Sequence, residues 1–378
     1  MSIKVLDLFS GCGGLTQGLI QSNLDVVLSN EYWKPAHDTN KNNHQNTYHI
    51  LGDITDDSVK QKIIKKCKKL KVNVITGGPP CQAYSNAGKK DQFDNRGLLY
   101  KDYIYIVKKI KPELCIIENV KGILSISHLK DNLNSQELKD VDDYKELLKN
   151  KEKSTDKRKE INLYKKRIAK LNELVIDKIM REFTELNYNI TYKVLNSADF
   201  GVPQRRERVI FIAAKKCYNI VYPLPTHNKD GTDGLKKWVS VKTAIDNLKD
   251  VPDDAKINHV RSIHTEQMIQ KMKDTEYEKS AQPKYKEAYF KCHPDKPSLT
   301  VKENHGAVFV HYEKNRCMTA RELARLQSFP DDFIFSGSKK DVLVQIGNAI
   351  PCLLGKHLGE NIRNIIENRE YANIEFVE

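Results

Sequence analysis

The first 120 residues alternate between apolar runs and stretches of helical periodicity, and this alternation constrains the fold more than any other feature. The runs are rich in branched and aromatic side chains, as buried strands are, and the stretches between them, such as 56–69 and 98–110, are long enough for helices. Strands separated by helices of this length indicate a parallel sheet with helices on both faces. The expected strands are residues 4–9, 25–30, 48–53, 72–78 and 114–120.

The rest of the chain extends this pattern. Apolar side chains from Ile161 to Leu186 recur at helical spacing, which predicts one long amphipathic helix that packs on the sheet. We therefore expect an α/β fold with a doubly wound, mostly parallel sheet of the Rossmann-like type. Further strands are expected at residues 189–196 and 209–214, and further helices at 319–328 and 353–367.

Shifts in composition predict the domain organisation. Mixed charges near residues 127–157 indicate solvated helices inserted into the first domain. After Tyr218 the pattern becomes irregular, with prolines, scattered aromatic residues and many lysines. We expect a first domain at 1–216, a smaller irregular domain at 217–330, and a C-terminal segment at 331–378 that returns to the first domain.

The chain has 63 Lys and Arg against 50 Asp and Glu, a formal net charge of +13. This excess predicts a polyanionic partner, although a compositional bias toward Lys and Asn would produce the same charge. No apolar run approaches the roughly 18 residues that span a bilayer, and residues 1–7 lack the shape of a signal peptide. We expect no membrane partner, and a soluble protein of the cytoplasm, or of the host cell interior if its source is viral.

The eight cysteines are scattered, and no C-x-x-C pair occurs among them. Neither a zinc site nor a disulfide framework is indicated, and no cluster of His, Cys and Asp argues for another metal. Most of these cysteines are expected to be buried apolar residues. They are Cys12, Cys67, Cys81, Cys115, Cys217, Cys292, Cys317 and Cys352.

Residues 7–14 have the sequence Asp-Leu-Phe-Ser-Gly-Cys-Gly-Gly and connect the first expected strand to a helix. Glycines let a ligand approach the backbone closely, although a tight strand-to-helix turn has a similar sequence. Acidic residues end the next two strands, Glu31 the second and Asp53 the third. A carboxylate at the end of the second strand is where a ribose diol would be held, whereas Asp53 could instead cap a helix.

A cysteine and a glutamate follow the next two strands. Cys81 comes directly after the sequence Gly-Gly-Pro-Pro, whose prolines restrict the backbone ahead of the thiol. Glu118 begins the sequence Glu-Asn-Val at the end of run 114–120. Because parallel strands end at one edge of a sheet, both side chains should face the same cleft.

Three further motifs follow along the chain. Alone, the first of them could be a run of salt-bridged residues at the start of a strand. Together with the motifs above, all three match the ordered motif series of a known family. The chain resembles cytosine-C5 DNA methyltransferases from residue 7 to residue 351. The three are Gln-Arg-Arg-Glu-Arg at 204–208, Arg-Glu-Leu-Ala-Arg-Leu-Gln-Ser-Phe-Pro at 321–330, and Gln-Ile-Gly-Asn-Ala-Ile-Pro at 345–351.

The resemblance implies transfer of a methyl group from S-adenosylmethionine to carbon 5 of a cytosine that is flipped out of a specific double-stranded DNA sequence. It assigns Cys81 as the nucleophile that adds to carbon 6, and Glu118 to the N3 and amino edge of the base. It assigns Arg208 to the cytosine O2, and Arg206 to organising Glu118 and favouring the thiolate. The base that removes the C5 proton is not identified, and water is one candidate.

The resemblance also implies the binding residues. Domain 217–330 would be the target recognition domain, and the segment after Cys81 a mobile catalytic loop. The residues expected around S-adenosylmethionine are Phe9, Gly11, Gly13, Glu31, Trp33, Asp53, Ile54, Leu99, Asn348 and Ala349. The residues expected to contact DNA are Ser85, Lys89, Lys90, Arg96 and Gln204.

Two other hypotheses remain open: a tRNA cytosine-C5 methyltransferase of the same fold, and an inactive DNA-binding relative. The first should have a short cysteine-containing signature that we do not find, and the second is disfavoured by intact Cys81, Glu118 and Arg208. We expect this protein to be the modification enzyme of a bacterial or viral restriction-modification system, in which a cognate endonuclease is its partner. The alternative is a methyltransferase that acts without an endonuclease. One cleft and one recognition domain suffice for a monomer.

Overall fold

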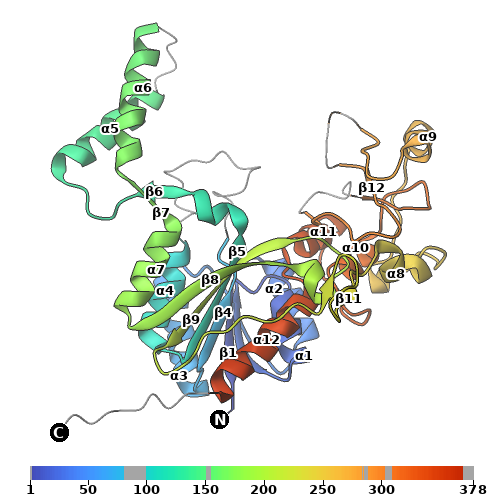
Figure 1. Ribbon diagram of the computed structural model, residues 1–378, viewed down its shortest axis with the longest axis horizontal. Coiled ribbons are helices and arrows are strands. Elements are labelled where there is room, and N and C mark those ends of the chain that lie inside the picture. The colour runs from blue at the N-terminus through green and yellow to red at the C-terminus, as the bar shows by residue number, and fades with distance from the viewer. Residues whose placement is uncertain are drawn as a thin grey trace.

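A seven-stranded sheet forms the centre of the molecule (Figure 1). The computed structural model describes residues 2–80, 99–149, 155–282, 284, 288–302 and 309–368. Strands β1 to β5 pair in parallel, and β9 is antiparallel to both of its neighbours, β5 and β8. In the order in which they pair, the strands are β3 (Tyr48–Leu51), β2 (Asp25–Glu31), β1 (Lys4–Leu8), β4 (Val74–Gly77), β5 (Leu114–Val120), β9 (Glu207–Lys215) and β8 (Tyr188–Asn196).

Helices cover both faces of the sheet because alternate residues of its strands point to opposite faces, and the residues on both faces are apolar. Leu6 and Leu8 of β1 belong to the core under α3, α4 and α7, while Val5, the residue before Leu6, belongs to the core under α1 and α12. This confirms the doubly wound, mostly parallel α/β fold that the sequence predicts. The covering helices are α1 (Gly14–Gln21), α3 (Asp57–Leu70), α4 (Leu99–Ile110), α7 (Val175–Glu185) and α12 (Cys352–Glu367), while α2 (Lys34–Asn43) links β2 to β3.

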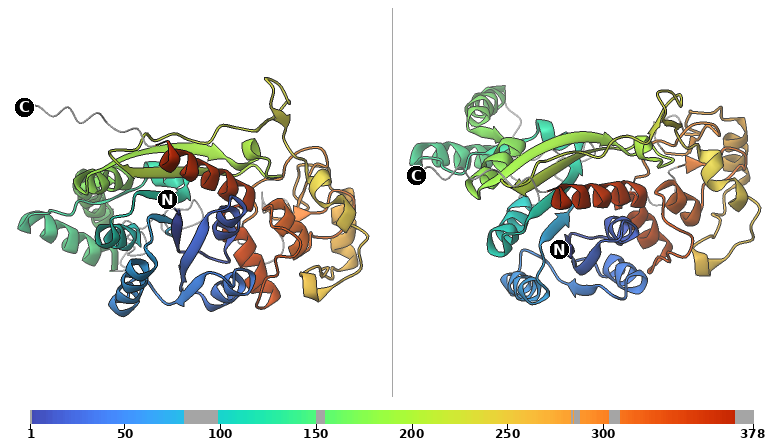
Figure 2. Two further views of the ribbon diagram at one scale, coloured as in Figure 1. Left: turned by 90° about the horizontal axis from the view of Figure 1, so that it is seen from below. Right: turned by 60° about the horizontal axis from the view of Figure 1, so that its bottom comes forward.

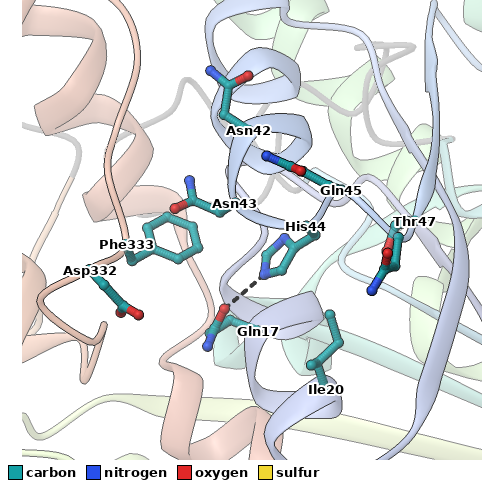
Figure 3. Close-up of a pocket in the computed structure, with 10 residues that line it drawn as sticks. Gln17, Ile20, Asn42, Asn43, His44, Gln45, Thr47, Asp332 and Phe333 are labelled. Carbon is teal, nitrogen blue, oxygen red and sulfur yellow. Dashed lines mark hydrogen bonds between the residues drawn. The ribbon is translucent and has the colours of Figure 1, made fainter.

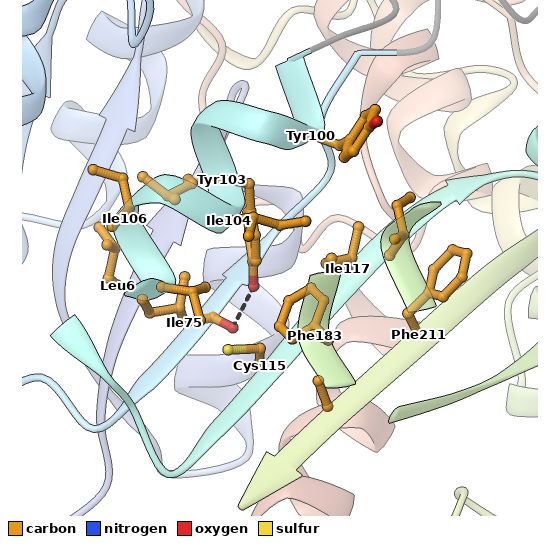
Figure 4. Packing of buried hydrophobic residues seen from close by; sticks show 14 of the residues in the cluster. Leu6, Ile75, Tyr100, Tyr103, Ile104, Ile106, Cys115, Ile117, Phe183 and Phe211 are labelled. Carbon is orange, nitrogen blue, oxygen red and sulfur yellow. Dashed lines mark hydrogen bonds between the residues drawn. The ribbon is translucent and has the colours of Figure 1, made fainter. Parts of the chain in front are cut away.

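The core under α4 contains one polar group that fixes the helix against the sheet. The Tyr103 side chain is fully buried, and its hydroxyl donates to the backbone oxygens of Ile75 at 2.9 Å and Ile116 at 3.1 Å. Figure 4 shows the ring among the apolar side chains, with the hydrogen bond to Ile75 drawn. A buried hydroxyl without a partner would destabilise the fold, so these bonds hold α4 over β4 and β5.

A pair of helices projects from the body between β5 and α7, and we call residues 127–149 and 155–174 the arm. Figure 1 and both views of Figure 2 show its helices standing away from the sheet. At its base, short strands β6 and β7 pair in antiparallel fashion. The arm consists of β6 (Ser127–Leu129), α5 (Ser135–Lys149), α6 (Thr155–Lys170) and β7 (Asn172–Leu174).

The prediction of a single long helix from Ile161 to Leu186 is wrong. β7 interrupts it, because its backbone pairs with β6 instead of continuing the helix. The apolar stripe is therefore divided between two cores. Its first part, including Ile168, packs against α5, and its second part, including Phe183, packs on the sheet.

Short elements connected by loops follow β9, at the opposite end of the molecule's long axis from the arm (Figures 1 and 2). The chain then returns to the sheet through the last three helices. α12 lies along α1, as Figure 2 shows. These elements are β10 (His227–Asn228), β11 (Lys236–Lys237), α8 (Val241–Ile245), α9 (Glu266–Asp274), β12 (Phe290–Lys291), β13 (Phe309–Val310), α10 (Ala320–Leu326) and α11 (Lys339–Asn348).

The contact between α1 and α12 gives a graded stability prediction. A Cβ at Gly18 would lie 2.3 Å from the Cys352 carbonyl oxygen, whereas a Cβ at Gly355 would lie 3.3 Å from its nearest neighbour. We expect Gly18→Ala to lower the free energy of unfolding by about 1–3 kcal/mol or more through overpacking. Gly355→Ala should be nearly neutral, because mild crowding is offset by up to about 1 kcal/mol of helix propensity. Urea unfolding measures both, and equal losses would contradict the predicted backbone clash.

Candidate active site

The turn after β1 is shaped for a ligand. Phe9, Gly11 and Gly13 all have positive φ angles, of 53°, 55° and 93°. A Cβ at Gly13 would lie 2.6 Å from the Asn40 side chain, so only glycine fits there, whereas a Cβ at Gly11 would meet no atom within 4 Å. The turn is therefore packed closely against Asn40 at Gly13, whereas the space beside Gly11 is open.

Glu31 joins the end of β2 to this turn. Its carboxylate accepts hydrogen bonds from the backbone N–H groups of Gly11 at 2.9 Å, Tyr32 at 3.0 Å and Trp33 at 2.8 Å. Burial raises the pKa of Glu31, and the three N–H donors act in the opposite direction. The carboxylate thus has a fixed position at the edge where β1 and β2 end, and the half-buried Trp33 lies two residues after it.

Asp53 and Ile54 follow β3, at the same edge. Asp53 is exposed, and its carboxylate accepts from the N–H and hydroxyl of Thr55 at 2.9 and 2.8 Å. The residue that caps α3 is Asp56, so the alternative role of Asp53 as a helix cap is excluded. Ile54 is buried in the core.

Asp7 is a buried carboxyl beneath the turn that the motif analysis did not single out. The hydroxyl of Thr76 donates to it at 2.9 Å from β4, and that of Thr16 donates at 2.7 Å from α1. Burial raises its pKa to about 6. Asp7 therefore links three elements around the turn, although a lone aspartate inside a strand gives no local signal of such a role.

Glu118 and Arg208 form an ion pair, with 2.8 Å between Glu118 Oε1 and Arg208 Nε. The strand register explains it, because Arg208 lies opposite Val120 in the antiparallel β5–β9 pair and Glu118 is two residues before Val120. The two side chains are therefore diagonal neighbours on one face. Only 12% of each side chain is exposed, so the pair forms a mostly buried base to the site.

The chain that leaves β4 passes against this pair. A Cβ at Gly78 would lie 3.1 Å from Glu118 Oε2, and the Asn119 side chain donates to the Pro79 carbonyl at 3.2 Å. The segment is therefore fixed beside Glu118 up to Pro80. Five predicted site residues after it lie outside the described residues: Cys81, Ser85, Lys89, Lys90 and Arg96.

Arg206 has a different place from the one expected. Its guanidinium donates to the carbonyl oxygens of Val301 at 3.0 Å and of Gly347 at 3.2 and 3.3 Å, while the ion pair with Glu118 is made by Arg208. The side chain is 3% exposed. The expected role of Arg206 in organising Glu118 is thus corrected. Arg206 connects the start of β9 to two segments that are distant in the chain, and Arg208 positions Glu118.

The predicted DNA contact of Gln204 is also corrected, because such a contact would need an accessible side chain. Gln204 is fully buried, and its amide nitrogen donates to the Leu326 carbonyl and to the Gln327 side chain at 3.1 and 2.8 Å. Its amide oxygen accepts from the Val301 N–H at 2.9 Å. These internal partners leave Gln204 as a structural link between β9, the loop region and α10.

A small cavity of about 50 Å³ lies at the centre of the site. Of the residues expected at the cofactor, Gly13, Glu31, Trp33, Asp53, Ile54 and Leu99 lie outside its lining, and Leu99 begins α4. The cavity connects the turn after β1 with Glu118 and with the C-terminal motif. Its lining residues are Asp7, Phe9, Ser10, Gly11, Leu15, Gly78, Glu118, Asn348, Ala349 and Ile350.

A larger hollow of about 410 Å³ lies elsewhere, between α1, the loop after α2, and the loop before α11 (Figure 3). His44 lies in its wall and pairs with Gln17, at 2.8 Å between the ring Nε2 and the amide oxygen. Burial lowers the pKa of His44 to about 4. Glu118 lines the smaller cavity and not this hollow, so the smaller cavity is the one at the candidate active site.

Within the described ranges, no group of three or more His, Cys, Asp or Glu side chains could hold a metal ion. No helix of the described residues is long and apolar enough to cross a membrane.

Comparison with known proteins decides the family. Residues 3–149 and 161–364 match the sequence pattern of the family described as C-5 cytosine-specific DNA methylase. The chain belongs to this family. The match confirms the resemblance and identifies the methylase as a DNA cytosine-5-methyltransferase.

Relatives of the methylase are type II methyltransferases by name. It is 32% identical over 385 residues to Type II methyltransferase M1.HphI of Haemophilus parahaemolyticus, covering 97% of this chain and 88% of that protein. It is also 32% identical to Type II methyltransferase M.NgoFVII of Neisseria gonorrhoeae, covering 92% and 83%. A solved structure from E. coli, described as a DNA modification methyltransferase encoded within a prophage, shares the fold with a TM-score of 0.70 at 21% identity, covering 97% and 100%. These findings favour the DNA hypothesis over the tRNA alternative.

Asp7 gives the methylase a testable pH dependence. Its pKa is about 6 in the fold and 3.8 ordinarily, so the folded state holds more protons between these values. The free energy of unfolding should therefore fall as pH rises from about 4 through 6, by about 3 kcal/mol, and stay reduced above that. Asp7→Asn should lack this part of the decline in urea unfolding. The exposed Asp25→Asn is the control, and identical pH profiles for wild type and Asp7→Asn would rule Asp7 out.

Proposed function

We propose that the methylase uses Cys81 as its nucleophile on a cytosine flipped out of duplex DNA, with S-adenosylmethionine as the methyl donor. One observation supports this most directly: the Glu118–Arg208 ion pair lies beside Gly78 and Pro79, where the chain leads into Cys81. An acid, a guanidinium and a thiol are then available to one base.

The edge formed by β1, β2 and β3 has side chains that fit the methyl donor. Glu31 accepts three backbone N–H groups, and a carboxylate has about four acceptor positions, so at least one is left for a ribose hydroxyl. Trp33 could stack on the adenine and Asp53 could accept its amino group. S-adenosylmethionine would supply an activated methyl on a sulfonium, and the open space before Gly11 would admit that end of the molecule.

The residues of the ion pair would bind the target base. Glu118 would donate a proton to N3 and accept from the exocyclic amino group, while Arg208 would donate to O2. These bonds stabilise the negative charge that develops on the ring when a thiolate attacks. Because Glu118 and Arg208 are preorganised by the β5–β9 register, little rearrangement would be needed at the moment of reaction.

The proposed reaction has three steps. The Cys81 thiolate forms a bond to C6, and the electron pair of the C5–C6 double bond becomes available at C5. C5 then takes the methyl group as the bond between methyl and sulfonium breaks and leaves a neutral thioether. A base, which water could provide, removes the C5 proton, and the C6–S bond breaks to restore the double bond and the thiolate.

DNA contacts and partners extend the proposal. Carbon 5 of a stacked cytosine is out of reach, so the base must be flipped. Residues 217–330 would then be the target recognition domain and 331–378 the segment that completes the catalytic domain 1–216. Ser85, Lys89, Lys90 and Arg96 would contact phosphates on a closing loop. We also propose a monomer that modifies the sites of a cognate restriction endonuclease.

The nucleophile can be tested with labelled methyl donor and pools of duplex DNA. The wild type should methylate duplex DNA, and bisulfite sequencing should place the product at C5 and identify the sequence. Cys81→Ala should lose turnover by at least about 1,000-fold because no other group can add to C6, while duplex binding persists. Cys217→Ala, at a half-buried cysteine packed on the core under α1 and α12, is the matched control and should remain active. Near-normal turnover by Cys81→Ala would refute the nucleophile, and transfer to tRNA alone would refute the DNA substrate.

The donor site can be tested by binding. Glu31→Gln keeps the size of the side chain but removes the charge and half of its acceptor capacity. The dissociation constant for S-adenosylmethionine should rise about 10- to 100-fold, as for lost hydrogen bonds to a charged group. Calorimetric titration measures this, and Asp25→Asn at the other end of β2 is the control. Unchanged affinity in Glu31→Gln would remove Glu31 from the donor site.

A further inference from the structure

The two helices of the arm differ in charge. α5 contains five acidic and three basic residues, whereas α6 contains two acidic and seven basic residues. The difference lies in adjacent, antiparallel elements, so a general lysine bias of the chain does not account for it. The family pattern does not match residues 150–160, which include the start of α6.

The basic residues of α6 lie away from its packed face. Ile161, Tyr164 and Ile168 pack against Val141 and Tyr144 of α5. Four cations outside this apolar face, which we call the basic face, are exposed and have no ion pair or hydrogen bond within the described part of the chain. They fall within an arc of about 140° on the helix surface at 100° per residue. They are Arg158, Lys165, Lys166 and Lys170.

Acidic neighbours do little to neutralise the helix. Arg167 lies 4.0 Å from Asp140 of α5, and Lys159 lies 3.4 Å from Asp156 one turn away. The acidic side chains of α5 otherwise form contacts of their own, such as Asp142 with Lys145 at 3.2 Å. The basic face therefore remains available for an anionic partner.

The arm is mounted firmly at its base. Lys178 of α7 is 1% exposed, and its ammonium donates to the Leu129 carbonyl at 2.6 Å and lies 3.3 Å from the Asp131 carboxylate. Arg181 binds Glu173 of β7 with both guanidinium nitrogens. Cations buried or paired in this way fix β6 and β7 to α7, so the arm is held in a definite direction rather than tethered by a loose linker.

A short segment connects the active site to the base of the arm. Ser127 follows Glu118 by nine residues, which can span at most about 32 Å even when fully extended. Figures 1 and 2 show the arm and the elements after β9 at opposite ends of the long axis, with the carboxyl ends of the strands between them. A duplex whose target base reaches Glu118 must lie over this edge, between the recognition elements and the arm.

We propose that the basic face of α6 binds the phosphate backbone of duplex DNA outside the recognition sequence, on the side of the active site opposite the recognition domain. This rests on the proposed action on duplex DNA. α6 has 16 residues and is about 24 Å long, which corresponds to about seven base pairs. Duplex DNA carries one charge per roughly 1.7 Å, so about 14 phosphate charges lie along that length. The contact adds affinity without adding sequence specificity, because phosphates have the same charge in every sequence.

The experiment compares two sets of four substitutions to glutamine, equal in charge change, in the full-length protein. The arm variant combines Arg158→Gln, Lys165→Gln, Lys166→Gln and Lys170→Gln, and glutamine keeps the helix propensity. The control variant changes exposed lysines on α3: Lys62→Gln, Lys65→Gln, Lys68→Gln and Lys69→Gln. Each protein is titrated with two duplexes that carry the sequence identified by bisulfite sequencing, one of about 12 and one of about 40 base pairs, over a range of salt concentrations.

On the long duplex, the arm variant should bind more weakly than wild type, and its slope of log K against log salt should be shallower by up to about 3.6, or 0.9 per lost phosphate contact. On the short duplex it should bind and methylate as wild type does. The control variant should match wild type on both.

Equal slopes for the arm variant and wild type on the long duplex would overturn the proposal and assign the basic face to another anionic partner, such as an acidic protein. An equal loss in the control variant would overturn it in favour of net charge alone. Failure of the wild type to methylate any duplex would overturn the proposed function, whereas the binding comparison by itself decides the role of the arm.

Discussion

The parallel pairing of β1 with both β2 and β4 is the constraint on which the site depends. The chain runs outward from β1 through β2 to β3, and then returns to place β4 and β5 on its other side. Neighbouring strands lie about 4.8 Å apart, so the ends of β2 and β5 are separated by roughly 14 Å. Glu31 at one and Glu118 at the other therefore bracket a space of the size that a methyl donor and a base must share. The open turn at Gly11 lies between them.

A second set of buried polar contacts joins distant segments to that edge. The Arg206 guanidinium reaches Gly347, 141 residues away, and Gln204 reaches Gln327, 123 residues away. Removing either side chain would leave buried carbonyl or N–H groups unpaired, which costs roughly 1–3 kcal/mol for each group. The run Gln-Arg-Arg-Glu-Arg thus combines two functions. Its first and third residues hold Val301, Gln327 and α11 in place, and its last residue pairs with Glu118.

Local patterns predicted most of the fold. The run at 114–120 and the strand β5 have the same bounds, because Leu114 to Ile117 are buried apolar residues, as expected of a strand covered on both faces. The same approach failed at residues 161–186, where helical spacing continues across β7. Periodicity records which side chains are buried, but it does not record whether they are buried in one core or in two. The family resemblance likewise implied a DNA contact for the glutamine of the 204–208 motif, whereas internal hydrogen-bond partners allow this side chain to be fully buried.

By itself, the sequence determined the sheet, the positions of Glu31 and Glu118 at strand ends, and the family, because each depends on short segments whose pattern is local. Tertiary structure alone decided that Arg208 rather than Arg206 pairs with Glu118, that Asp7 is buried between Thr16 and Thr76, and that the basic residues of α6 are carried on an arm whose base is fixed to α7. Strand register, burial and docking of distant segments set these features. All three depend on contacts between residues far apart in the chain, which no local pattern of residue types records.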